Sequence, residues 1–230
     1  QQRNIGITIP YVRTLTHIVW ADNLYFLASS LEDLRCMMQE FTDLPTQAGM
    51  EWKGGSLQVL HTNSVSQPCC FQLQQGSEQI DVEAVTELEG LGVLLSNDGS
   101  SQTILKHRLN KATACFYSLS DVFLSRSVPL WKKFKEFSQR VQPIALYTSE
   151  ACSWSQALYT QILRWENMCL RRMCSLRRRP EEPFHIFIRH TTHSARLWFH
   201  QRGFRSVATK LLERQHRIIG ASFQRLAIDL

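Results

Sequence analysis

An acidic residue lies between two apolar runs near the start of the chain, in the Trp-Ala-Asp-Asn stretch at residues 20–23. Residues 15–19 precede it and residues 24–28 follow it, and both runs are rich in side chains that favour strands. Asp22 and Asn23 tolerate the positive φ of a tight turn. The pattern therefore predicts a β-hairpin with a carboxylate at its tip, where a divalent metal could bind. The alternative is an ordinary turn without a metal.

Two cysteines and two histidines farther along have a spacing close to that of a zinc finger, namely Cys169, Cys174, His185 and His190. Cys169 and Cys174 are five residues apart on an expected helix, so they do not share a face. An arginine-rich segment also separates the two pairs. We therefore expect these residues to be ordinary core or surface side chains, and we expect no zinc site.

The charge is divided unevenly along the 230 residues, whose net charge is +6. Residues 1–100 carry 4 Lys/Arg and 12 Asp/Glu, whereas residues 101–230 carry 22 Lys/Arg and 8 Asp/Glu, so the net charges are −8 and +14. A strongly basic second part indicates a polyanionic partner, and nucleic acid is the expected one. The alternative is that the basic side chains only cover solvent-facing helices or dock on the acidic first part.

The amino-acid composition limits the classes of protein to which the chain can belong. The chain is 43% hydrophobic and 20% charged, so it can form a core. No run of about 18 apolar residues occurs, so no membrane partner is expected. Seven cysteines without a disulfide-framework pattern fit an intracellular protein of the nucleus or cytoplasm. The first residues include neither an initiator methionine nor a signal peptide, so we expect a piece of a longer chain.

One helix is expected directly after the hairpin. Ser30 is a typical N-cap, and apolar residues recur at helical spacing between Leu31 and Phe41. Gly49 predicts the end of this helix, whereas Pro45 predicts a kink or an earlier end. The two segments that follow, residues 50–53 and 57–60, favour short strands.

The predicted secondary structure changes from short strands to helices at a turn formed by residues 97–100. The polar segment 62–83 before it predicts a loop or an irregular hairpin. Beyond the turn, the apolar period predicts helices at 104–123, 128–145 and 154–174, and then two more that are separated near Gly203. Pro143 predicts a kink or break in the second of these helices. The aromatic residues expected in the core include Phe116, Phe134 and Trp165.

Taken in chain order, these pieces resemble the palm and thumb of reverse transcriptases from non-LTR (LINE-type) retrotransposons. Residues 20–23 are similar to the family's Tyr/Phe-Ala-Asp-Asp motif, and the Leu-Glu-Gly-Leu-Gly-Val stretch at residues 88–93 resembles its "YLG" stretch. The similar segments are residues 20–23, 48–53, 88–99, 105–112, 144–150 and 163–172. The resemblance covers roughly residues 12–175, and it is much fainter beyond them.

The resemblance implies RNA-templated DNA synthesis that uses Mg²⁺, an RNA template, a DNA primer and deoxynucleoside triphosphates. Asp22 would be one metal ligand, and Asn23 stands where the family has a second Asp. Lys53 lies near the family's palm lysine, a general acid for pyrophosphate that usually stands two or three residues later. Leu91 and Gly92 would form the primer grip, where the backbone supports the primer end.

We therefore predict an α+β fold, with the C-terminal part of a palm at residues 1–96, a helical thumb at 97–176 and a basic helical extension at 177–230. The expected function is a fragment of an RNA-directed DNA polymerase that is inactive alone, because the family's other metal-binding Asp lies on an upstream strand. The alternative is a nucleic-acid-binding remnant without catalysis. The expected nucleic-acid contacts are Lys106, Arg108, Lys111, Lys132, Lys133, Arg171, Arg172, Arg177, Arg178 and Arg179.

Overall fold

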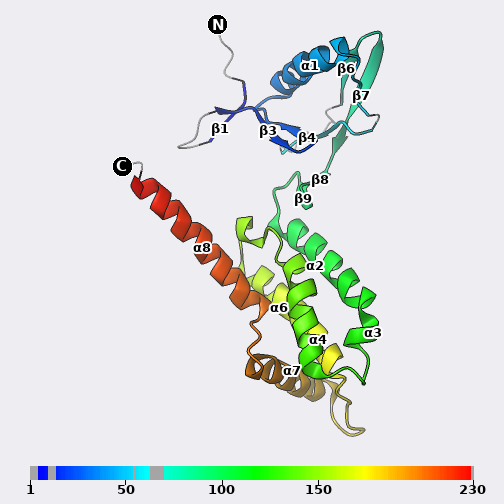
Figure 1. The fold of residues 1–230 in the computed structure, drawn as a ribbon, viewed down its shortest axis with the longest axis vertical. Coiled ribbons are helices and arrows are strands. Elements are labelled where there is room, and N and C mark those ends of the chain that lie inside the picture. Colours follow the sequence, from blue (N-terminus) through cyan, green and yellow to red (C-terminus); the bar gives the residue numbers. More distant parts are fainter. Residues whose placement is uncertain (1–4, 10–13, 54, 63–69, 229–230) are drawn as a thin grey trace. The chain divides into compact units, whose positions relative to one another are not determined.

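The computed structural model describes residues 5–9, 14–53, 55–62 and 70–228. It divides into a first unit, residues 1–89 with 96–99, and a helical unit, residues 90–95 with 100–230 (Figure 1). Small sheets occupy the first unit and helices the second, so the expected α+β class is confirmed. Among the described residues, no helix combines the length and the apolar character needed to cross a bilayer.

Short strands and one long helix lie between residues 5 and 96, of which residues 90–95 belong to the helical unit. Their bounds are β1 Ile7–Thr8, β2 Thr14–Leu15, β3 His17–Trp20, β4 Asn23–Phe26, α1 Leu31–Gln47, β5 Gln58–Leu60, β6 Phe71–Gln75, β7 Glu78–Val85, β8 Glu87–Gly90 and β9 Val93–Ser96. Strands β3 and β4 pair antiparallel, as the two apolar runs predicted. Strands β8 and β9 form a second hairpin, whose turn belongs to the helical unit.

Helix α1 begins and ends where the sequence predicted. The Ser30 side chain accepts a hydrogen bond from the Asp33 N–H at 3.1 Å. At the other end, the Met50 N–H donates to the Pro45 carbonyl and Gly49 has a φ of 75°, which is a Schellman ending. Pro45 does not end the helix early, because it lies in the last turn and removes only one backbone hydrogen bond there.

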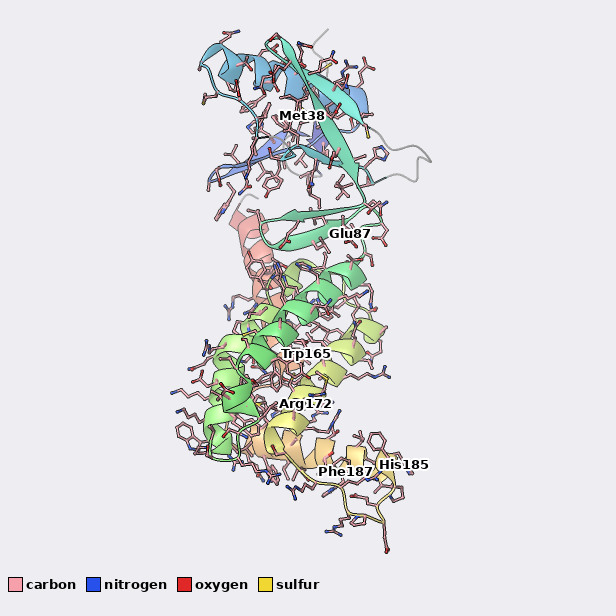
Figure 2. The ribbon with its side chains drawn as sticks, turned by 90° about the vertical axis from the view of Figure 1, so that its right-hand side faces the viewer. Met38, Glu87, Trp165, Arg172, His185 and Phe187 are labelled. Atoms are coloured by element: carbon pink, nitrogen blue, oxygen red, sulfur yellow. The ribbon has the colours of Figure 1, made fainter. Side chains whose placement is uncertain are left out.

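Of the two alternatives predicted for residues 62–83, a loop or an irregular hairpin, the described part of the segment forms a hairpin, but a regular one. Strands β6 and β7 form a regular antiparallel hairpin, and β5 pairs with β7 in parallel. Phe71 and Leu73 point into the core and alternate with exposed glutamines, which is the pattern of a half-buried strand. Figure 2 labels Met38 on α1, which is buried with these side chains.

The strand predicted at residues 50–53 does not form. The segment is instead held by Trp52, whose indole N–H donates to the Thr42 hydroxyl at 2.9 Å and whose backbone N–H donates to the Gln75 side chain at 3.1 Å. These two bonds satisfy the tryptophan with partners on α1 and β6, so no neighbouring strand is needed.

The helical unit contains the helices that the apolar period predicted. Their bounds are α2 Ser101–Ser118, α3 Ser120–Phe123, α4 Leu130–Glu136, α5 Gln142–Ala145, α6 Gln156–Cys174, α7 Phe184–Gln201 and α8 Val207–Ile228, with a 3₁₀ turn at Ser149–Ala151. Phe116, Phe134 and Trp165 are all buried, as expected. Figure 2 shows Trp165 within the bundle, where its indole N–H donates to the Thr113 hydroxyl at 2.9 Å.

The helix predicted over residues 128–145 is interrupted by a π-helix at Phe137–Val141. There the Gln142 N–H donates to the Phe137 carbonyl, five residues earlier. Pro143 follows directly and occupies the first turn of α5, where a missing N–H costs least. The predicted kink at Pro143 is therefore a change of helix type just before the proline.

The expected separation of residues 177–230 as a third part differs from the structure. Ala195 and Phe199 of α7, with Val207 and Leu211 of α8, are buried in the same cluster as the core residues of α2 to α6. The buried Glu166 carboxylate also accepts from the Val207 N–H at 2.8 Å and so caps the start of α8. These helices therefore belong to one helical unit.

Candidate nucleic-acid interface

The tip of the β3–β4 hairpin differs by one residue from the predicted turn. Trp20 pairs with Asn23, so Ala21 and Asp22 are the two turn residues and Asn23 is the first residue of β4. Ala21 has a φ of 54°, which costs a non-glycine residue roughly 1–2 kcal/mol. The Asn23 amide donates to the exposed Asp22 carboxylate at 3.4 Å. The hairpin thus holds a carboxylate at a strained, solvent-facing tip.

These residues do not make a metal centre by themselves. Asp22 supplies one carboxylate and Asn23 one neutral amide oxygen, whereas a divalent metal takes several oxygen ligands. Within the described ranges, no group of three or more His, Cys, Asp or Glu side chains is placed to hold a metal ion. Lys53 is exposed in the irregular segment after α1, where its carbonyl accepts from the Ser56 hydroxyl, and no described contact joins it to Asp22.

The turn of the β8–β9 hairpin consists of the two residues predicted as a primer grip. Leu91 has a φ of 52° and Gly92 a φ of 72°, and positive values at both positions are typical of a type I′ turn. A Cβ on Gly92 would lie 3.2 Å from an Arg108 guanidinium nitrogen, so glycine also allows a close approach. Both backbone carbonyls of this turn accept hydrogen bonds from helical-unit side chains.

Arg108 and Tyr147 fasten this turn to the helices. The Arg108 guanidinium donates to the Gly92 carbonyl, and the Tyr147 hydroxyl donates to the Leu91 carbonyl at 2.9 Å. The guanidinium carbon also lies 4.2 Å from the centroid of the Tyr147 ring, within cation–π range. Arg108 is only 7% exposed. Its predicted role as a phosphate contact is therefore wrong, because the guanidinium is buried and donates to the carbonyl of Gly92.

Replacing Arg108 with methionine is expected to lower the free energy of unfolding by about 1.5–3 kcal/mol, since a charged hydrogen-bond donor is lost. Tyr147→Phe removes one neutral hydrogen bond and is expected to cost about 1 kcal/mol. Urea unfolding measures both changes, and hydrogen exchange of the hairpin amides reports where they act. Unchanged exchange at residues 90–95 in both variants would show that these contacts do not hold the turn.

The remaining basic residues predicted as contacts divide into two groups. Seven are exposed, namely Lys106, Lys111, Lys132, Arg172, Arg177, Arg178 and Arg179. Lys133 is buried, and its ammonium donates to the Met173 carbonyl at 3.0 Å. Arg171 is half-buried and donates to the Thr192 hydroxyl at 2.9 Å.

Lys133 is therefore a second correction. Met173 lies in the last turn of α6, where carbonyls lack helical partners, and the Lys133 ammonium satisfies one of them. Burial lowers the pKa of this lysine. Its long apolar stem explains how a lysine beside Phe134 can enter the core of the bundle.

The cysteines and histidines with zinc-like spacing lie in different surroundings. Cys169 is fully buried in the core, and burial raises the pKa of its thiol to about 12. Burial raises the pKa of the Cys174 thiol to about 11. Both thiols are therefore held in the neutral form in the packed helical unit. His185 and His190 are exposed on α7.

Sequence reasoning missed two residues that shape this interface, Tyr147 and Glu166. Tyr147 lies in the segment 144–150 that resembles the family, but no spacing links it to Leu91, 56 residues earlier. Glu166 lies on the apolar side of α6, among the buried residues of that helix. An acidic residue at an apolar position is the one sequence signal that could have indicated its buried role.

Comparisons of the chain with protein-family models, curated proteins and solved structures found no match.

Proposed function

We propose that this chain is the C-terminal part of an RNA-directed DNA polymerase of the non-LTR retrotransposon type, which binds an RNA template paired with a DNA primer. Asp22 would supply one ligand to a Mg²⁺ centre that needs further carboxylates from outside these residues. The helical unit would hold the phosphates of the hybrid, and the turn of Leu91 and Gly92 would support the primer end.

The observation that carries this proposal is the fastening of the Leu91–Gly92 turn to a basic helical unit. A support for a primer end must keep its position while the strand is held by its phosphates. Arg108 and Tyr147 bond both carbonyls of the turn, so the turn is fixed to the helices that carry Lys106 and Lys111. The exposed Asp22 on its strained hairpin tip gives independent support.

A specific observation favours the alternative of nucleic-acid binding without catalysis. Asn23 replaces a carboxylate of the family's motif, and its amide is directed at Asp22 at 3.4 Å. A neutral side chain there lowers the negative charge that attracts a divalent cation. Both functions share the same nucleic-acid partner and differ in whether a primer end is positioned for reaction.

Photo-cross-linking tests the positioning of the primer end. A DNA primer with a photoreactive 3′-terminal base, annealed to RNA, is expected to cross-link at Leu91, Gly92 or their immediate neighbours. A matched probe about ten base pairs away, one turn of the duplex, is expected to cross-link within α2 or α4 instead. Equal labelling of the helices by both probes would remove the polymerase proposal and leave nucleic-acid binding alone.

A further inference from the structure

One face of α7 carries a row of cationic and protonatable side chains. His185, Arg189, His193, Arg196 and His200 follow each other at intervals of four, four, three and four residues, and all five are exposed. At 100° per residue they fall within an arc of about 80°. Figure 2 labels His185, the first of the row, at the start of α7. We call these five residues the α7 row.

The α7 row borders a shallow groove of about 530 Å³, which Ile188, Thr192 and Leu197 also line. The opposite side of the helix is occupied by the core, because Thr191, Ala195 and Phe199 are buried. The row therefore lies away from the buried side of the helix. From its first to its last residue it extends about 22 Å, the axial length of six to seven base pairs.

Most charges near the α7 row are positive, and the acidic residues nearest in sequence are Glu181 and Glu182, three to four residues before His185. Helix α7 contains no Asp or Glu between Phe184 and Gln201. From α6, which packs against it, Arg171 donates to Thr192 at the edge of the groove, and Arg172 lies one residue farther on. The carboxyl group on α6 is that of Glu166. Burial raises the pKa of this carboxyl, and Arg196 is among the groups that oppose the rise. A row of this kind attracts a chain of anions.

We propose that the α7 row is a binding site for the sugar-phosphate backbone of a nucleic acid, separate from the contacts predicted on α2, α4 and α6. This inference rests on the proposed nucleic-acid partner. The two arginines hold phosphates through their planar guanidinium groups, which match the geometry of a phosphate. The ring N–H groups of the three histidines can donate hydrogen bonds to phosphate oxygens on either side of the arginines.

The salt dependence of binding tests the α7 row. Each phosphate neutralised adds roughly 0.7–0.9 to the slope of log affinity against log salt. Anisotropy titrations of a labelled RNA–DNA hybrid with the full chain measure this slope. The triple variant His185→Gln, His193→Gln, His200→Gln is expected to bind the hybrid more weakly than the unaltered chain.

Two further variants separate this row from other cations. Arg189→Gln together with Arg196→Gln is expected to lower the slope by about one to two units. His190→Gln is the matched control, since His190 is exposed on the same helix but does not border the groove, and its slopes should equal those of the unaltered chain. Thermal unfolding by circular dichroism checks that every variant is folded.

The outcomes distinguish the row from the wider function. Binding that persists with the same slope in the two-arginine variant would overturn the α7 site and leave the proposed nucleic-acid function intact. No binding of the hybrid at low salt would overturn both. Tighter binding of polyglutamate than of the hybrid, lost in the same variants, would assign the row to an acidic protein and would also overturn the proposal.

Discussion

Replacing Phe116 with alanine is expected to lower the free energy of unfolding of the helical unit by about 3–5 kcal/mol. The Phe116 ring is fully buried, stacks on Phe123 with centroids 4.7 Å apart, and meets Phe137 edge-on at 6.3 Å. Alanine would leave a cavity among closely packed rings that collapse only partly into it. Urea unfolding of the full chain, followed by circular dichroism, measures the loss as a lower midpoint.

A matched control for this change is Leu124→Ala, at the residue that follows α3. Leu124 is 42% exposed, so its truncation is expected to change stability by no more than about 0.5 kcal/mol. A loss for Phe116→Ala as small as that of the control would mean that the aromatic cluster does not form the core of the unit.

The helical core could be predicted because its apolar residues recur over long segments with a period of 3.6. Phe116, Phe134 and Trp165 all stand on such stripes, and all are buried. The regular pairing of strands β6 and β7 was missed because they alternate apolar residues with glutamine and aspartate, so the segment as a whole is polar. The pairing of β5 with β7 in parallel joins residues 25 positions apart, which no local pattern indicates.

Binding of the full chain to an RNA–DNA hybrid is expected to weaken about 10³-fold or more between 50 and 200 mM salt at pH 7.5, if six or more phosphates are neutralised. Seven of the predicted cations are exposed, beginning with Lys106 and Lys111 on α2 and ending with Arg179. Each phosphate contact releases counterions, so salt competes directly with binding. Fluorescence anisotropy over a salt series measures the slope.

The variants for this test compare the exposed lysines Lys106 and Lys111 with the buried Lys133. Lys106→Ala with Lys111→Ala is expected to lower the slope by about one to two units. Lys133→Met is the control, because the buried ammonium already serves the Met173 carbonyl and its loss should leave the slope unchanged. An equal change of slope in the double variant and in Lys133→Met would show that the exposure of a lysine does not decide whether it contacts a phosphate. A slope of zero in the unaltered chain would contradict the proposal that the chain binds phosphates.

The sequence predicted where the candidate site lies, but it did not predict the role of every residue in the site. The turn at Leu91 and Gly92 and the hairpin tip at Asp22 follow from local residue types. The role of Arg108 does not, because an arginine that bonds a carbonyl 16 residues away looks the same in sequence as one that faces solvent. Burial of single cations depends on which carbonyls and rings the packed helices bring near them, and only the structure shows that.

The π-helix before Pro143 limits how the length of this chain can change during evolution. A π-helical turn holds one residue more than an α-helix needs, so loss of one residue between Phe137 and Val141 would restore a continuous α-helix. That helix would then run into Pro143, at a cost of about 3 kcal/mol. Replacement of the proline must therefore come first in any lineage that loses the residue, which makes the order of these two mutations predictable.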